Sequence, residues 1–172
     1  MKDAITTILE RHSVREYTDQ PVADEQLYVL LRAAMAAPSA KNMQPWHFVV
    51  IKERETLNRL MKALPYAKML EKAPLAIAVC GDTENSQGVA PNSWVMDCSA
   101  ATENLLLAAQ ALNLGAVWTG VYPYPDRVEP VQKALELPVS VVPLNVIVIG
   151  YPLTKGKAKD KWKKERIHLE SW

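Results

Sequence analysis

The sequence of 172 residues is poor in the side chains that bind metal ions. It holds two cysteines, Cys80 and Cys98, which do not form the spaced pair of a metal site. Its three histidines stand in separate predicted elements, and none has a partner four residues away on a helix. A zinc site is therefore not expected. Because the first residues lack the pattern of a signal peptide, both cysteines are expected to be reduced and buried in a cytoplasmic protein.

The sequence also lacks a large net charge and a long apolar run. Its net charge is +1, so no overall field attracts nucleic acid. No segment reaches the roughly 20 apolar residues of a membrane span. Apolar residues make up 49 % of the chain, which excludes a disordered protein. We therefore expect a single folded domain over residues 1–172, with neither nucleic acid nor membrane as a partner.

Three common catalytic motifs are missing. No Gly-x-Gly-x-x-Gly follows a predicted strand, so a classical dinucleotide-binding domain is not expected. No Gly-Lys-Ser/Thr phosphate loop is present, which argues against a nucleoside triphosphatase. No Gly-x-Ser-x-Gly occurs, which argues against a serine hydrolase with a nucleophile elbow.

A polar loop separates a predicted helix over 23–36 from an apolar run over 48–51, which is typical of a strand buried on both faces. Its side chains Ser39, Asn42 and Gln44 can each donate and accept hydrogen bonds. Such a loop suits a flat polar heterocycle better than a metal or a bare phosphate. The other interpretation is a polar loop that only caps its neighbours.

Two arginines and a serine alternate near the N-terminus. If residues 11–17 are extended, Arg11, Ser13 and Arg15 point the same way, and two guanidinium groups with a hydroxyl could hold a phosphate. Alternatively, the segment is a solvated basic turn with weak ion pairs to Glu10 and Glu16.

Hydrophobic periodicity predicts the remaining elements. Helices are expected over 3–10, 53–62, 93–113 and 126–136, and strands over 74–81, 116–121 and 139–150. The helix over 93–113 is apolar nearly all round, which predicts the centre of the fold or a subunit interface. Gly115 is expected to end this helix, and Gly120 allows something to approach the backbone closely.

The tail over 155–172 differs from the rest of the chain. Seven lysines and arginines against two acidic residues lie between Lys155 and Arg166. Apolar residues follow at Ile167, Leu169 and Trp172. We expect the tail to cover another surface, either of its own domain or of a second subunit.

Three segments in combination resemble the nitroreductase family of FMN-dependent oxidoreductases, in a compact form. They are Arg11-His12-Ser13-Val14-Arg15, Ala37-Pro38-Ser39-Ala40-Lys41-Asn42-Met43-Gln44-Pro45-Trp46, and Gly150-Tyr151-Pro152 with the lysine-rich tail. The resemblance implies an α+β fold, with a mainly antiparallel sheet between helix layers in a three-layer α/β/α arrangement. It also implies a homodimer with two FMN sites at the interface and the arm over 155–172 crossing to the partner.

The resemblance also assigns the residues that bind FMN. They are Arg11, His12, Ser13, Arg15, Pro38, Ser39, Ala40, Asn42, Gln44, Trp118, Thr119, Gly120, Lys159 and Lys161. Arg11 and Ser13 would hold the phosphate and the ribityl chain, and Arg15 the pyrimidine edge of the flavin. The loop residues would line the ring or come from the other subunit. The backbone over 118–120 would lie near N5 and O4.

Some of these assignments stay open. His12 either contacts the flavin or is a polar spacer, and Trp118 is either near the flavin or a core residue. Either Lys159 or Lys161 would add a cation on the phosphate. No side chain is assigned as catalytic.

The implied function is an FMN-dependent oxidoreductase. It would take a hydride from NADH or NADPH and reduce a small conjugated acceptor, such as a nitroaromatic or a quinone, in a ping-pong cycle. Two alternatives remain: another flavin reaction on the same scaffold, such as dehalogenation or heterocycle oxidation, or a low-turnover flavin-binding or regulatory protein.

Overall fold

The computed structural model describes residues 3–84 and 88–172. One four-stranded sheet runs through the molecule in the order β1-β2-β4-β3, and each neighbouring pair is antiparallel. The strands are β1 (Trp46–Ile51), β2 (Leu75–Asp82), β3 (Gly115–Gly120) and β4 (Val141–Gly150). The helices are α1 (Ala4–Glu10), α2 (Asp24–Met35), α3 (Arg54–Ala63), α4 (Ser93–Ala111) and α5 (Pro125–Leu135). Short 3₁₀ turns lie at Ala40–Asn42, Lys68–Glu71 and Lys164–Arg166.

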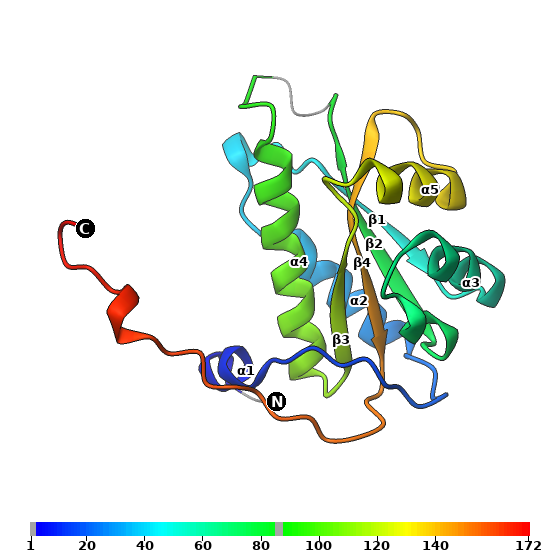
Figure 1. Ribbon diagram of the computed structural model, residues 1–172, viewed down its shortest axis with the longest axis horizontal. Helices are drawn as coiled ribbons and strands as arrows, with labels where there is room; N and C mark the ends of the chain where they lie inside the picture. The colour runs from blue at the N-terminus through cyan, green and yellow to red at the C-terminus, as the bar shows by residue number, and fades with distance from the viewer. Residues whose placement is uncertain (1–2, 85–87) are drawn as a thin grey trace.

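Helices cover both faces of this sheet (Figure 1). The central strands β2 and β4 are apolar on both faces, so alternate residues enter two separate cores. Ile77 and Ile147 pack against α2 and α4, while Ala78 and Val146 pack against α3 and α5. Two covered faces make three layers, which confirms the predicted α+β fold with an antiparallel sheet. Each predicted helix and strand is present, with ends that differ by one or two residues.

The prediction for β1 was wrong in one respect. Phe48, Val49 and Val50 are only partly buried, although their run of apolar residues suggested a strand covered on both faces. The reason is the position of β1 at an edge of the sheet, where a strand has one neighbour instead of two. Burial of this degree depends on strand order, which hydrophobicity does not encode.

The end of α4 also differs from the prediction. Asn113, with φ of 59°, takes the left-handed position, while the N–H of Leu114 donates to the carbonyl of Ala109 at 2.8 Å. Gly115 is instead the first residue of β3. A Cβ on Gly115 would lie 2.6 Å from Cγ1 of Val14, so glycine allows the N-terminal segment to cross β3 closely.

That N-terminal segment meets the condition set for residues 11–17, because it is extended where it bridges to other segments. Ser13 forms a parallel bridge with Ala116, and Tyr17 forms an antiparallel bridge with Pro152. The N–H of Val14 donates to the carbonyl of Ala116 at 3.0 Å. The segment therefore runs along the outer edge of β3 at Ala116 and then pairs with Pro152, just after the end of β4.

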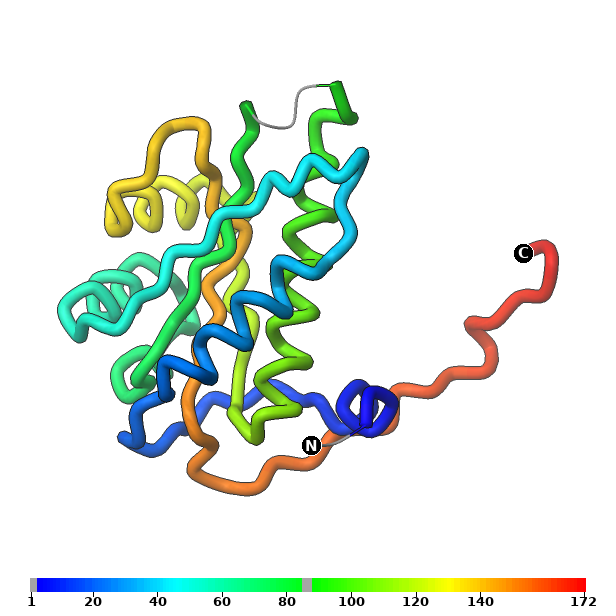
Figure 2. The backbone as a smooth tube through the Cα atoms, turned by 180° about the vertical axis from the view of Figure 1, so that it is seen from behind, coloured from blue at the N-terminus to red at the C-terminus, as the bar shows by residue number. Residues whose placement is uncertain are grey.

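The C-terminal tail leaves the body of the molecule, and its end lies far from the sheet (Figures 1 and 2). Its apolar side chains are exposed, among them Trp162, Leu169 and Trp172. A groove of about 430 Å³ between α1, α2 and α4 is also apolar, with Ile8 and Leu107 in its wall. The domain in this structure thus covers neither the tail nor this groove.

Among the residues that the structure describes, no helix is both long enough and apolar enough to cross a lipid bilayer.

Both thiols are expected to be unreactive in the folded protein. Burial raises the pKa of Cys80 and of Cys98 to about 12, so almost no thiolate exists at pH 8. A thiol reagent such as 5,5′-dithiobis(2-nitrobenzoate) should label neither cysteine in buffer at pH 8 and both in concentrated guanidinium chloride. Rapid labelling of either thiol in buffer would contradict this burial.

Candidate functional site

A pocket of about 160 Å³ lies at the end of β3. Its lining comes from four parts of the chain: Arg15, the turn with Pro65, Tyr66 and Met69, the strand residues Val117, Trp118, Thr119 and Gly120, and Arg127 of α5. Four predicted site residues, Arg15 and 118–120, therefore meet here although about a hundred positions separate them in the sequence. A larger pocket of about 470 Å³ lies next to it and shares Arg15, Tyr66 and Met69.

The backbone at this end of β3 is open to a ligand. A Cβ on Gly120 would meet no atom closer than Nε1 of Trp118 at 4.0 Å, so packing within the chain does not require glycine there. Beyond Ala116, the outer edge of β3 pairs with no other strand of the described residues. An unpaired strand edge offers backbone N–H groups to a bound molecule.

Buried polar atoms without partners lie in the same wall. Oγ1 of Thr119 and Nε of Arg127 are buried and have no hydrogen-bond partner within the described chain. Nη1 of Arg127 donates to the carbonyl of Gly120 at 3.2 Å, and the guanidinium lies 4.1 Å above the ring of Tyr124. Unpaired buried polar groups are rare in folded proteins and often mark a site where a ligand or water binds.

The turn that forms the opposite wall is held by Arg54 of α3. The Arg54 guanidinium donates to the carbonyls of Leu70, Glu71 and Ala73 at 2.6 to 2.9 Å. Tyr66 in this turn has a φ of 63° and a side chain that is 89 % exposed. A bulky residue in the left-handed region is strained, and strain of this kind gathers at functional sites.

The polar loop at 38–44 lies elsewhere, beside the N-terminal part of α4. Oδ1 of Asp97 in α4 accepts the N–H of Ala40 at 3.0 Å. Within the loop, Oγ of Ser39 accepts the N–H of Gln44, and the Gln44 amide donates to Oδ1 of Asn42, both at 3.0 Å. Pro38 is exposed. None of these loop residues lines the pocket at Gly120.

This loop holds itself in a strained shape. Lys41, Asn42 and Gln44 all have positive φ, between 50° and 56°. The hydrogen bonds within the loop and to Asp97 agree with a loop that only caps its neighbours. Three strained residues in one exposed loop agree instead with a binding role.

The predicted site residues Arg11, His12 and Ser13 precede Arg15 in the N-terminal segment, and none of them lines the pocket at Gly120. Nε of Arg11 lies 3.3 Å from Oε1 of Glu103 in α4, a different acidic partner from the expected Glu10 or Glu16. Ser13 is exposed beside β3. Nδ1 of His12 lies 2.9 Å from the carbonyl of Glu10, and its ring packs directly against Gly156 of the tail. His12 thus contacts the start of the tail.

The two lysines predicted in the tail are both exposed. Neither lysine lines the pocket at Gly120, and the C-terminal tail runs away from the sheet (Figure 1). Within this single chain, the structure therefore brings neither of them to the pocket at Gly120.

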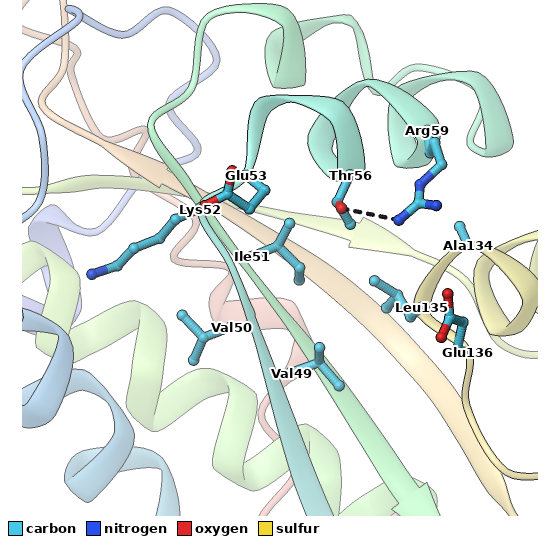
Figure 3. Close-up of a pocket in the computed structure, with 10 residues that line it drawn as sticks. All are labelled: Val49, Val50, Ile51, Lys52, Glu53, Thr56, Arg59, Ala134, Leu135 and Glu136. Carbon is cyan, nitrogen blue, oxygen red and sulfur yellow. Dashed lines mark hydrogen bonds between the residues drawn. The ribbon is translucent and has the colours of Figure 1, made fainter.

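Another pocket, of about 220 Å³, lies at the opposite edge of the sheet (Figure 3). It is lined by β1, the start of α3 and the end of α5, and includes Arg59, whose Nη2 donates to Oγ1 of Thr56 at 3.0 Å. None of the predicted site residues lines it. Since β1 and β3 are the two edges of the sheet, this pocket is separate from the one at Gly120.

Comparisons with known proteins identify the family. The Nitroreductase family profile matches residues 8–151. This chain belongs to the nitroreductase family. A protein of Methanothermobacter thermautotrophicus, provisionally named NADH dehydrogenase/NAD(P)H nitroreductase, is 45 % identical over 99 % of this chain and 88 % of its own. The predicted family is thus confirmed.

Two solved structures agree with this assignment. A Parabacteroides distasonis protein with the same provisional name has a TM-score of 0.95 and 49 % identity, and the match covers 100 % of both chains. An FMN-dependent nitroreductase from Clostridium difficile has a TM-score of 0.90 and 28 % identity, with 98 % of this chain and 99 % of its own covered. The nitroreductase fold therefore extends over nearly the whole chain.

Tyr66 and Arg127 were not predicted as site residues from the sequence. They reach the pocket from a turn and from α5. In the sequence each looks like an ordinary surface residue of a helix or turn. Only the pairing of β3 with β4 and the packing of α5 beside α3 bring them to Gly120 and Arg15.

Loss of the Arg54 clamp should destabilise the wall of the site. The substitution Arg54→Met leaves three carbonyls without their charged donor and should lower the free energy of unfolding by about 1–3 kcal/mol in a urea titration. Arg59→Met is the matched control, because Arg59 in the same helix bonds, among the described residues, only to Thr56 of that helix. The control should change stability by less than about 0.5 kcal/mol, and equal losses in both variants would refute the clamp.

Proposed function

We propose that this protein is an FMN-dependent NAD(P)H oxidoreductase that reduces a small conjugated acceptor, such as a nitroaromatic or a quinone, by a ping-pong mechanism. The observation that carries the proposal is the pocket at the end of β3. It combines an open strand edge, an uncrowded Gly120 and the guanidinium of Arg15. Family membership and the names of the relatives, which mention NAD(P)H and FMN, support it.

The chemistry of the lining suits a flavin. An isoalloxazine ring is flat and carries oxygen and nitrogen atoms along one edge, so it needs backbone room and hydrogen-bond donors. Gly120 supplies the room, and Thr119 carries a buried hydroxyl oxygen that has no partner among the described residues. The fit therefore rests on the open space at Gly120 and on the Thr119 hydroxyl, neither of which is taken up by contacts within the described residues.

Arg15 and residues 118–120 would hold the ring, while Arg11, Ser13 and one of Lys159 or Lys161 would hold the phosphate. FMN, when bound, supplies the redox chemistry, because it accepts two electrons from NAD(P)H and passes them to the acceptor. Among described residues, Arg15 has no ion pair with a carboxylate. Its uncompensated charge would stabilise negative charge that develops on a neighbouring ring during reduction.

The protein would act as a homodimer formed by the single domain over 1–172. The apolar groove between α1, α2 and α4 and the exposed end of the tail are surfaces that a second copy would bury. In this arrangement the arm over 155–172 crosses to the partner. The preformed loop with Pro38, Ser39, Ala40, Asn42 and Gln44 then reaches the partner's ring. A cytoplasmic location remains a prediction.

The first test is the absorption spectrum of the purified protein, reconstituted with FMN and titrated anaerobically with NADH and then NADPH. Flavin bands that bleach with at least one donor, and recover when a nitroaromatic or quinone is added, are expected for this function. Bands that persist with both donors would favour another flavin reaction or a binding role. A protein that takes up no FMN would contradict the proposal altogether.

Gly120→Ala should separate ligand binding from stability. Because nothing in the chain crowds that position, the apoprotein should keep its free energy of unfolding within about 0.5 kcal/mol. The added methyl group would meet the flavin, and overpacking of about 1–3 kcal/mol would raise the Kd for FMN about 5- to 150-fold.

Gly115→Ala is the matched control in the same strand. Its new methyl group would meet Val14, so the apoprotein should lose about 1–3 kcal/mol of stability. If Gly120→Ala destabilised the apoprotein as much as this control, or bound FMN as tightly as the wild type, the flavin would not lie against Gly120.

A further inference from the structure

The pocket at Gly120 contains two guanidinium groups and no carboxylate. Arg15 and Arg127 both line it, and the other lining residues are uncharged. Within the described part of the chain, neither arginine has an ion pair with an acidic side chain. Two unbalanced positive charges in a small pocket favour an anionic ligand.

Arg127 is held in place before any ligand arrives. Its Nη1 donates to the carbonyl of Gly120, and its guanidinium stacks on the ring of Tyr124. Its Nε is buried without a partner, and Nη2 makes no hydrogen bond to a described residue. An arginine that is already oriented by two contacts loses little side-chain freedom when it binds a carboxylate.

We propose that Arg127 binds an acidic substituent of the acceptor, so that the enzyme prefers conjugated acceptors that carry a carboxylate. This inference rests on the proposed function, in which Arg15 serves the flavin and Arg127 is left for the second substrate. The exposed ring of Tyr66 on the opposite wall offers an apolar face to the conjugated ring of that acceptor.

The position of the charge on each substrate favours the acceptor over the electron donor as the anion. In NADH and NADPH, the nicotinamide ring carries a neutral carboxamide, and a ribose separates the ring from the charged phosphates. A donor ring placed against the flavin therefore brings no anion close to Arg127, whereas a benzoate-type acceptor does.

The test compares two acceptors of the same shape, 4-nitrobenzoate and 4-nitrobenzamide, with the FMN-loaded wild type and Arg127→Gln. The quantity measured is kcat/KM for each acceptor at low ionic strength. Comparing the benzoate-to-benzamide ratio between the two proteins cancels the different intrinsic reactivities of the acceptors. The ratio should fall about ten- to hundredfold in Arg127→Gln, as expected for a hydrogen bond to a charged group.

Lys133→Gln is the matched control, because it removes the same charge from the same helix at an exposed position outside the pocket. It should leave the ratio unchanged. A readout without turnover is the Kd of benzoate for the oxidised holoprotein, followed by its flavin spectrum. That Kd should rise by a similar factor in Arg127→Gln and stay unchanged in Lys133→Gln.

Several outcomes would overturn the inference. A ratio and a benzoate Kd that are the same in Arg127→Gln and wild type would show that Arg127 does not bind the anion. Loss of FMN, or slower bleaching by NADH with an unchanged ratio, would assign Arg127 to the flavin or the donor instead. If wild-type protein bound no FMN or was not bleached, the proposed function would fail, and this inference with it.

Discussion

Two-sided burial of the central strands is the constraint on which the rest of the structure depends. β2 and β4 are apolar along both faces, and water must be excluded from each face by a layer of helices. The helices α2 and α4 cover one face of the sheet, and α3 and α5 cover the other. With both faces covered, the backbone of this sheet remains accessible only at its edges, β1 and β3. Ligand chemistry that uses strand backbone must therefore lie at an edge.

The edge at β3 is shaped by close backbone contacts. Because Gly115 has no Cβ, the extended N-terminal segment lies against the first residues of β3, Gly115 and Ala116. Tyr17 then anchors the segment, with its hydroxyl 2.6 Å from the carbonyl of Val14 and 3.0 Å from that of Val148. This places Arg15 beside the later residues of β3, 117–120, whose outer edge is unpaired within the described residues. The packing that closes one half of this edge thus positions a cation at the half that stays open.

Two apolar surfaces of the single chain are open to water, and the proposed homodimer would cover both. Apolar side chains such as Leu169 and Trp172 are exposed at the end of a basic tail, and an apolar groove is open beside α4. The helix α4 was expected at the centre of the fold or at an interface, and its sheet-facing side is buried while Leu107 and Ala111 line the open groove. Hydrophobic surface of this extent is stabilised when a partner removes it from water.

The sequence by itself determined the elements, the fold class and the family, because hydrophobic periodicity, turn residues and motif order are local properties. Through the family resemblance it also predicted that Arg15 and 118–120 share a flavin site, and these residues line one pocket. Only the tertiary structure decided that β1 is half-buried, that Asn113 ends α4, and that Tyr66 and Arg127 join the pocket. Those facts depend on strand order and on which helix packs beside which edge. Such long-range relations arise from the packing of the whole chain and leave no mark on neighbouring residues.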